Sequence, residues 1–216
     1  MSKFYLQSGY KGKETASIVY SYDREDYSYS ARSEYQQGQI PVGSVEFVEE
    51  YIGVREPNYY PAFLRDMFKR KIWREDYKPK TVCFIKPADR HKRFDAKIHK
   101  ERAGVSPGWL REEDGGPYWC SEIVKFTDEW RYYVANGKIL AAYWYDGLNQ
   151  EEVDAPSLNI DWPKDFCGAV DFGRLSNGEI ALVENNLPYG CGWYGSYEDG
   201  RIYGEWLEAG FGFLRI

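Results

Sequence analysis

The sequence lacks the patterns that mark membrane, zinc-binding and disulfide-rich proteins. No apolar run approaches the roughly 20 residues that a transmembrane helix needs, and the stretch MSKFYLQSGYKGKE has no apolar signal core. The four cysteines include no CxxC pair and there are only two histidines, so neither a structural zinc site nor a disulfide framework is indicated. We therefore expect reduced thiols, a cytoplasmic location and no membrane partner.

An excess of positive charge is also missing. The net charge is -6 over 216 residues, and nucleic-acid binding depends on Lys and Arg that neutralise phosphates, so a nucleic-acid partner is not expected. Aromatic residues, in contrast, are abundant, with 20 Tyr, 8 Trp and 11 Phe. They fit a stacking surface for sugars or bases, or a core of half-buried strands. A non-catalytic module that binds carbohydrate or protein is therefore one alternative.

The first third of the chain predicts short strands and two helices. Residues 1–40 are polar and tyrosine-rich and indicate a short strand or two. Ser44 is a suitable N-cap for a helix of about ten residues that ends at Gly53. Apolar spacing after Pro61 predicts a second helix over residues 61–76, with Lys69, Arg70 and Lys71 as a solvated basic end.

The rest of the chain predicts antiparallel strands. Asn136-Gly137 between alternating apolar residues is a strong hairpin signal. A short irregular helix over 150–165 and a closing helix over 202–211 complete the prediction. Helices early and antiparallel strands later favour an α+β protein. The strands are expected at residues 81–88, 96–102, 118–126, 129–146 and 166–187.

Asp171, Glu184 and Asn186 lie on either side of a tight Ser-Asn-Gly turn in the run AVDFGRLSNGEIALVENN. Two strands joined by that turn bring these oxygen atoms together, whereas Asn185 is expected to face the other way because side chains alternate along a strand. Mg²⁺ is usually held by one or two carboxylates plus substrate phosphates. The spacing therefore suggests a magnesium–nucleotide site, and the alternative is a surface hairpin with solvated acids.

From residue 81 to 195 the chain resembles the catalytic domain of the ATP-grasp family. Four motifs occur in the family's order, and agreement in order and spacing is stronger than any one motif. The resemblance implies two antiparallel-sheet subdomains that clamp ATP, with a reduced N-terminal lobe over residues 1–78 and a catalytic region over 79–216. The motifs are VCFIKP at 82–87, SEIVKFTDEWRYYVANGKIL at 121–140, Val170-Asp171, and Glu184-Asn185-Asn186 in place of the family's E-x-N.

The same resemblance implies a set of nucleotide contacts. Lys86 would meet an ATP phosphate as a point charge. The loop from Asp89 to Asp95 would close over the triphosphate, although it lacks the family's usual glycines, and Lys92 and Arg93 are its expected phosphate contacts. The remaining expected contacts are the backbone at Ile123 and Val124 for adenine, Glu122 for the adenine amino group or for orienting Lys86, and Glu129 for the ribose.

Arg131 is the expected catalytic cation. Ligases of the D-alanine:D-alanine type carry arginine two residues before the metal-binding aspartate, and here Ala169 holds that place. Arg131 lies on the same strand face as Glu129, where a guanidinium can stabilise charge that develops during phosphoryl transfer. An arginine with lysines, GSVEF at 43–47 and Tyr60-Pro61 resemble a phage and bacterial branch named for one arginine and two lysines. Candidates for its second lysine are Lys71, Lys92 and Lys97.

The loop LPYGCGWYG at 187–195 resembles the segment that lines the acceptor side. Its aromatic residues Tyr189, Trp193 and Tyr194 fit pocket walls or core equally well. The resemblance implies an ATP- and Mg²⁺-dependent ligase that activates a small carboxylate as an acylphosphate and passes it to an amine acceptor, an amino acid or peptide. A phosphotransferase on the same fold is the nearest alternative, and the oligomeric state is not indicated.

Overall fold

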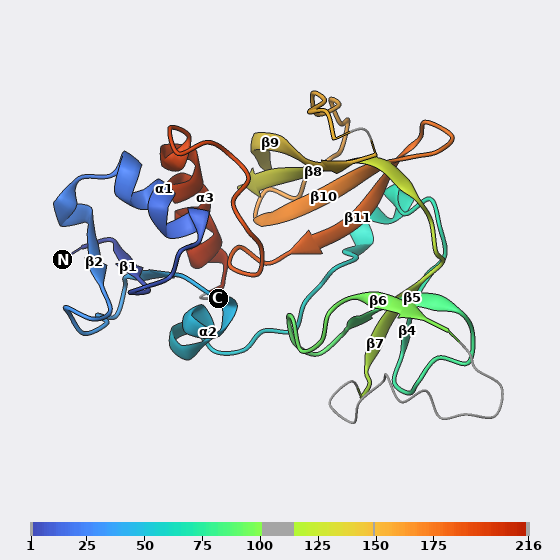
Figure 1. Ribbon diagram of the computed structural model, residues 1–216, viewed down its shortest axis with the longest axis horizontal. Coiled ribbons are helices and arrows are strands. Elements are labelled where there is room, and N and C mark those ends of the chain that lie inside the picture. Colours follow the sequence, from blue (N-terminus) through green and yellow to red (C-terminus); the bar gives the residue numbers. More distant parts are fainter. Residues whose placement is uncertain (1, 101–114, 149, 215–216) are drawn as a thin grey trace.

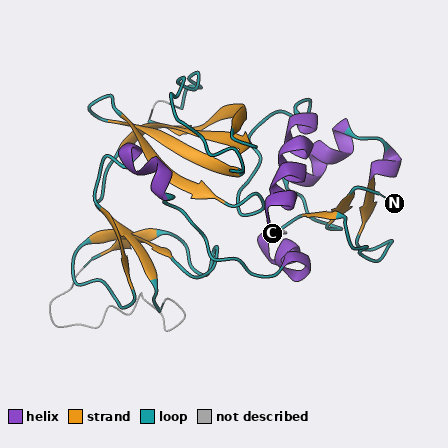
Figure 2. Ribbon diagram, turned by 180° about the vertical axis from the view of Figure 1, so that it is seen from behind, coloured by secondary structure: helices purple, strands orange, loops and turns teal. Residues whose placement is uncertain are grey.

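The computed structural model describes residues 2–100, 115–148 and 150–214. Figure 1 shows three parts: a lobe that contains the N-terminal strands and all three α-helices, a large sheet of four strands, and a small sheet of four strands. Seen from behind in Figure 2, the strands of the large and small sheets lie on one side of the molecule and this helical lobe on the other. The described part of the chain holds no helix long and apolar enough to cross a membrane.

The N-terminal lobe is built on a parallel sheet of three short strands in the order β2-β1-β3. The sequence predicted only a strand or two here, and it did not predict helix α1 (Lys13–Ser21). Three-residue strands are too short to show alternation, and α1 has only Glu14, Thr15, Ser17 and Ile18 as buried residues, so its apolar stripe is weak. The remaining bounds are β1 (Phe4–Leu6), a 3₁₀ turn η1 (Arg24–Asp26), β2 (Tyr27–Tyr29) and β3 (Ile40–Val42).

Helix α2 (Val45–Ile52) confirms the first predicted helix. The Ser44 side chain accepts a hydrogen bond from the backbone N–H of Phe47 at 3.2 Å, which satisfies one of the free donors at a helix start. Gly53 ends the helix with a φ of 77°, a conformation that glycine adopts without steric cost.

The second predicted helix is wrong over most of its length. Only a 3₁₀ helix, η2 (Ala62–Met67), forms, and Lys69 then turns the chain with a φ of 50°. Strand β4 (Ile72–Glu75) follows and pairs antiparallel with β7 (Tyr118–Ser121). The apolar spacing resembled a helix, but pairing with a strand more than forty residues away determines the conformation, and local periodicity cannot reveal such a partner.

The small sheet has the order β4-β7-β5-β6 and is antiparallel throughout, as predicted for its strands from residue 81 onward. Strand β7 stops at Ser121, and residues 122–125 continue without a ladder toward the large sheet. Residues 101 and 102 of the predicted return strand lie outside the described residues. The other bounds are β5 (Cys83–Pro87) and β6 (Lys97–His99).

The large sheet has the order β11-β10-β8-β9 and contains the two predicted hairpins. Asn136 and Gly137 have φ values of 49° and 70°, which suit the tight turn that joins twisted strands. The short helix predicted over 150–165 is absent, because two prolines interrupt that segment and Trp130 and Tyr132 bind its carbonyl groups with their side chains. The bounds are β8 (Phe126–Ala135), β9 (Lys138–Gly147), β10 (Gly168–Leu175) and β11 (Ile180–Asn186).

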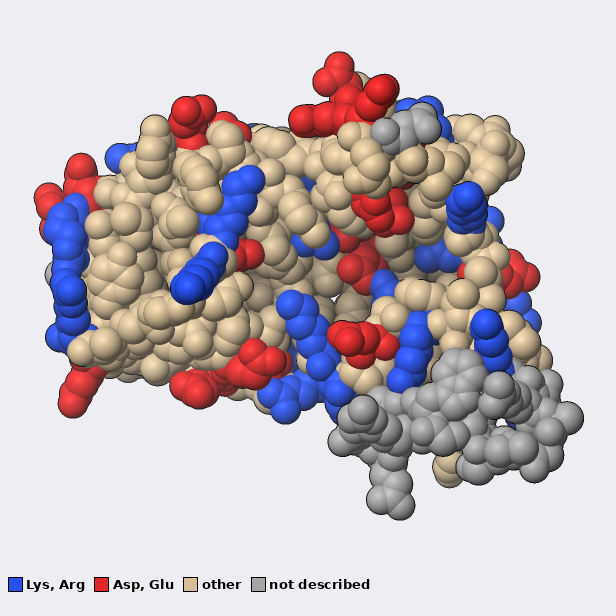
Figure 3. All heavy atoms as spheres, viewed as in Figure 1, with Lys and Arg blue, Asp and Glu red and all other residues tan. Residues whose placement is uncertain are grey.

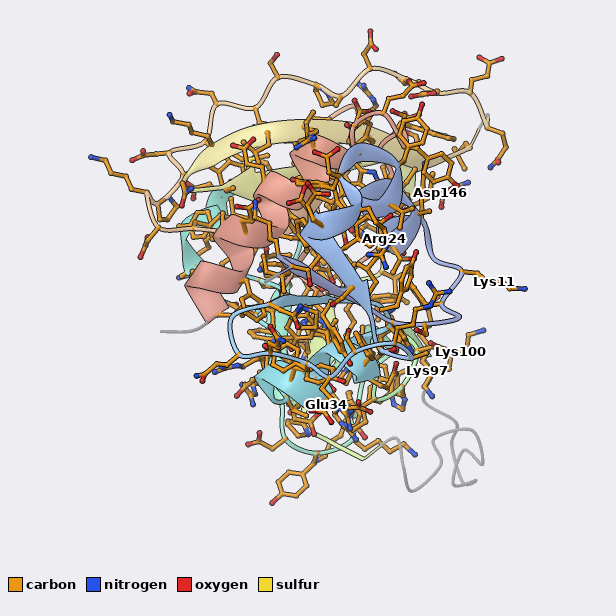
Figure 4. The ribbon with its side chains drawn as sticks, turned by 90° about the vertical axis from the view of Figure 1, so that its left-hand side faces the viewer. Lys11, Arg24, Glu34, Lys97, Lys100 and Asp146 are labelled. Atoms are coloured by element: carbon orange, nitrogen blue, oxygen red, sulfur yellow. The ribbon has the colours of Figure 1, made fainter. Side chains whose placement is uncertain are left out.

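Helix α3 (Gly200–Leu214) joins the lobe to the large sheet. The end-on view of Figure 4 shows α3 and α1 next to each other. Trp206 on α3 is fully buried, donates its indole N–H to the Gly168 carbonyl at 3.1 Å and packs edge-on against Tyr133. The α+β class is therefore confirmed, while the lobe boundary at residue 78 stays a prediction.

Replacing Trp206 with alanine tests this junction. We expect the free energy of unfolding to fall by about 3–5 kcal/mol, because a buried indole leaves a cavity and an unpaired carbonyl. Urea unfolding measures the change. Tyr77→Ala, at a side chain that is 85% exposed, is the control and should change the free energy by less than about 0.5 kcal/mol. Equal losses in the two variants would contradict the assignment.

Candidate active site

The ladders of the large sheet place three charged side chains opposite one another. In the β-sheet register Asp171 on β10 lies across from Glu184 on β11 and from Arg131 on β8. Directly opposite residues point to the same face of a sheet. The hairpin that the sequence predicted therefore gathers two carboxylates and a guanidinium on one face.

Arg131 and Asp171 form a buried two-bond ion pair. Nε and one terminal nitrogen of Arg131 donate to the two carboxylate oxygens of Asp171, both at 2.7 Å. The side chains are 7% and 1% exposed. Burial alone would lower the pKa of Arg131, but the adjacent Asp171 carboxylate raises that pKa well above its ordinary value. Arg131 is therefore a permanent cation at this place.

Lys86 extends from β5 of the small sheet to the same face. Its ammonium group contacts the Glu184 carboxylate directly and lies 5.2 Å from the centre of the Tyr59 ring. Burial lowers the pKa of Lys86 to about 7, while Asp171 acts in the opposite direction, and the contact with Glu184 also favours the charged form. Each acidic residue of the pair Asp171 and Glu184 thus has its own cation.

Asn186 completes the group on this face. Its amide nitrogen donates to Glu184 Oε1 at 3.0 Å. Asn185 points away and donates to the Asn58 carbonyl at 2.8 Å, as expected from alternation along a strand. The three side chains predicted as metal ligands, Asp171, Glu184 and Asn186, therefore offer oxygen atoms on one face.

A pocket of about 390 Å³ lies between the small and large sheets on one side of Lys86. Its walls are mostly apolar, and it includes the segment that connects the two sheets. Five of its lining residues are among those the sequence predicted as nucleotide contacts. The lining residues are Arg70, Phe84, Lys86, Ile98, Ser121, Glu122, Ile123, Val124, Lys125, Phe126, Glu129 and Val183.

The two acidic residues of this pocket have different environments. Glu129 accepts a hydrogen bond from the Tyr145 hydroxyl at 2.6 Å, and burial raises the pKa of Glu129 although that bond opposes the change. Glu122 is exposed and accepts the backbone N–H of Lys71 at 2.9 Å. Glu184, and not Glu122, is the acid that contacts Lys86.

A second pocket of about 250 Å³ opens on the other side of Lys86. It is more polar and is bounded by the loop after β5 and by the segment after β11. Lys86 is the residue that both pockets share. The second pocket is lined by Tyr59, Lys86, Pro87, His91, Lys92, Phe94, Asp95, Ala96, Arg131, Glu184, Asn186, Gly190, Cys191, Gly192 and Tyr194.

The cations that the sequence nominated are not all in the site. Lys92 lines the second pocket. Arg93 instead pairs with Asp89 at 2.9 Å and lies outside the linings of both pockets. Lys97, labelled in Figure 4, lies beside the Phe94 ring, and Lys71 lies over Trp73. Of the three candidates for a second lysine, Lys92 is the one with access to a pocket.

Arg70 was not predicted as a site residue. It was expected to be a solvated helix end, yet it lines the first pocket and donates to the carbonyls of Leu182 and Val183 on β11. These carbonyls directly precede Glu184. The spacing of the sequence carried no signal for this contact, because a run of three basic residues looks like an ordinary surface.

The aromatic residues after β11 divide between core and pocket. Trp193 is buried among Tyr133, Tyr143 and Tyr203. Tyr189 is also buried. Tyr194 is 40% exposed and lines the second pocket, with its ring centre 4.8 Å from the Arg131 guanidinium. Only Tyr194 of the three predicted wall residues therefore faces the pocket.

The surface shows where these charges are accessible. In Figure 3 acidic and basic side chains lie together in the hollow between the large sheet and the small sheet. The hollow corresponds to the region where the two pockets meet at Lys86.

Replacing Arg131 with leucine tests the buried ion pair. We expect the free energy of unfolding to fall by about 3–5 kcal/mol, because Asp171 is left buried without a partner. The double variant with Asp171→Leu should lose less than the sum of the two single variants. The control is Arg174→Leu in the same sheet, whose pair with Asp128 is 3.4 Å long and partly exposed and should contribute less than about 1 kcal/mol. Additive losses in denaturant unfolding would contradict a direct pair.

Comparison with known proteins agrees with this arrangement. The family model for an ATP-grasp domain, family 2 of the clade named for one arginine and two lysines, matches residues 65–201, and no curated protein matches. D-alanine–D-alanine ligase from Bacillus anthracis is similar with a TM-score of 0.48 and 11% identity over 100% of this chain and 98% of that one. N5-carboxyaminoimidazole synthetase from Staphylococcus aureus has 0.46 and 10% over 86% and 70%.

The ATP-grasp ligase PsnB, complexed with a minimal precursor, is also similar, with a TM-score of 0.41 and 13% identity over 70% of this chain. The chain spans 57% of the length of PsnB. The family model covers more than half of the chain and includes β4 to β11. The predicted ATP-grasp fold is thereby confirmed, and the chain belongs to the ATP-grasp family, within the clade named for one arginine and two lysines.

Proposed function

We propose that this protein is an ATP- and Mg²⁺-dependent ligase that joins a carboxylate to an amine through an acylphosphate. The observation that carries the proposal is the meeting of two pockets at one buried lysine, Lys86, beside two carboxylates and a guanidinium. One pocket suits a nucleotide and the other suits the reacting groups. Family membership supports the use of ATP.

The pocket between the sheets is suited to an adenosine. Its apolar walls include Phe84, Ile98 and Val183, which provide contact for a flat base. Residues 122–125 are not paired in a ladder, so backbone groups at Ile123 and Val124 are available to the edge of the base. Glu129 at the far wall would accept hydrogen bonds from ribose hydroxyls, since a carboxylate can accept two at once.

Asp171, Glu184 and Asn186 fit a magnesium site by the chemistry of their donors, because Mg²⁺ prefers carboxylate and carbonyl oxygens. Magnesium there would neutralise charge on the β- and γ-phosphates. Without a nucleotide, Arg131 and Lys86 balance the two carboxylates. Arg131 uses donors on all three of its nitrogens, two toward Asp171 and one toward the Gly192 carbonyl. Two of its five N–H groups remain for a phosphoryl oxygen.

The reaction places its second substrate in the pocket with Lys92, Arg131 and Tyr194. A carboxylate oxygen attacks the γ-phosphorus, the bond to the β-phosphate oxygen breaks, and ADP leaves. The amine then attacks the acyl carbon, inorganic phosphate leaves and the amine loses a proton. Lys86 and Arg131 lie where negative charge develops in both steps, and fixed charges in a partly water-free site stabilise it without reorganisation. A covalent enzyme intermediate is not required.

Ligand-induced stabilisation tests the nucleotide site. MgATP at 100 times its dissociation constant should add about 2.7 kcal/mol to the free energy of unfolding, measured by thermal or urea unfolding. Glu184→Gln should remove most of the magnesium-dependent part of that gain, because it removes an anionic ligand. Glu179→Gln, at the turn of the same hairpin, is the matched control. No stabilisation of the wild-type protein by MgATP would support the aromatic binding module instead.

Product analysis tests the chemistry. In a screen of amino acids, short peptides and polyamines, we expect ADP and phosphate release that depends on both a carboxylate and an amine. Hydroxylamine should trap the acylphosphate in place of the amine. Glu184→Gln serves as the blank, and Glu179→Gln should match the wild type. A stable phosphorylated product in place of free phosphate would identify a phosphotransferase and contradict the ligase.

A further inference from the structure

The segment over residues 192–197 is irregular, yet side chains from distant elements hold its main chain. On one side it meets β8 of the large sheet. The Gly192 carbonyl accepts hydrogen bonds from Arg131 at 3.1 Å and from the Tyr133 hydroxyl at 2.7 Å. The Tyr194 N–H donates to the same Tyr133 hydroxyl at 3.0 Å. Arg131 is therefore tied to this segment as well as to Asp171.

On the other side the same segment meets helix α1 of the N-terminal lobe. Glu14 Oε1 accepts the backbone N–H of Trp193 at 3.1 Å. Lys13 donates its ammonium to the Tyr194 carbonyl at 3.3 Å, and Ser21 donates its hydroxyl to the Tyr197 carbonyl at 3.0 Å. Helix α1 thus replaces the ladder that the segment lacks.

Glu14 is the buried member of this set. It is 9% exposed, and its carboxylate fits between two glycines. A Cβ at Gly192 would lie 3.3 Å from Oε1, and a Cβ at Gly12 would overlap the other carboxylate oxygen. A buried charged acceptor that receives a backbone N–H contributes more than an exposed one, because the donor has no water to replace it.

The connection leads to one pocket only. Gly192, Tyr194 and Arg131 line the pocket proposed for the reacting groups. The nucleotide pocket is lined by residues from 70 to 183, with none from α1 or from residues 192–197. A disturbance at Glu14 should therefore reach the acceptor side and leave nucleotide binding intact.

The geometry points to Glu14 as a positioning residue for acceptor use. By fixing Trp193, it holds Tyr194 and the Arg131 contact in place from the N-terminal lobe, without itself lining either pocket. The lobe thereby determines the shape of the acceptor pocket. This inference rests on the proposed ligase function in so far as it names the acceptor.

Two substitutions at Glu14 separate position from charge. Glu14→Ala removes the acceptor of the Trp193 N–H, and we expect at least about a tenfold loss in kcat/KM for the amine acceptor found in the screen. The dissociation constant for MgATP should change less than about twofold. Glu14→Gln keeps an oxygen acceptor and should stay close to the wild type in both. Ser21→Ala on the same helix, which loses only the bond to Tyr197, is the matched control.

Amide hydrogen exchange of the ligand-free protein provides a readout that does not depend on activity. The Trp193 N–H should exchange at least about tenfold faster in Glu14→Ala than in the wild type and in Glu14→Gln. Unchanged exchange in Glu14→Ala, an equal loss of MgATP affinity, or a Glu14→Gln variant as impaired as Glu14→Ala would each overturn the inference. If the wild-type protein uses no acceptor, the proposed function fails and the acceptor role with it, while the exchange of Trp193 still decides whether Glu14 holds the segment.

Discussion

The guanidinium of Arg131 and the carboxylate of Asp171 are both buried and joined by two short hydrogen bonds. Either charge alone would be costly at this depth, so the pair requires β8 and β10 to keep a register in which the two residues are opposite. A slip of one residue would turn both side chains to the other face. The positions of Glu184 and Lys86, and of the pockets on either side of Lys86, all follow from that register.

The site is balanced in charge before any ligand binds. Asp171 is neutralised by Arg131, and Glu184 is neutralised by Lys86. An anionic phosphate alone would meet two carboxylates, and a metal ion alone would meet two cations. A ligand that brings both signs of charge can exchange partners with both pairs, since the freed lysine and arginine donors then face phosphate oxygens and the freed carboxylates face the metal. The arrangement therefore favours a metal–nucleotide complex over either component.

Sequence reasoning succeeded where a local signal determines the structure. The Ser44 cap, the Asn136-Gly137 turn and the alternation around Asp171 and Glu184 each act within a few residues, and the structure has them as predicted. It failed where a distant partner decides. Strand β4 depends on the edge of β7, and Arg70 depends on the carbonyls of β11. The contacts of α1 with residues 192–197 also cross most of the chain, and no local pattern encodes them.

The place of the arginine follows from how the lobe packs on the sheet. Ala169 precedes Asp171 by two residues, so its side chain points to the same face, yet it is fully buried in the aromatic core that includes Tyr133, Trp193 and Trp206. A guanidinium at position 169 would lie in that core without a carboxylate of its own, which is strongly unfavourable. The cation next to Asp171 must therefore come from a neighbouring strand, and β8 provides it at the directly opposite position, where it also reaches the Gly192 carbonyl. The same aromatic packing that attaches the N-terminal lobe thus explains why Arg131, on the strand beside Asp171, is the arginine of this site.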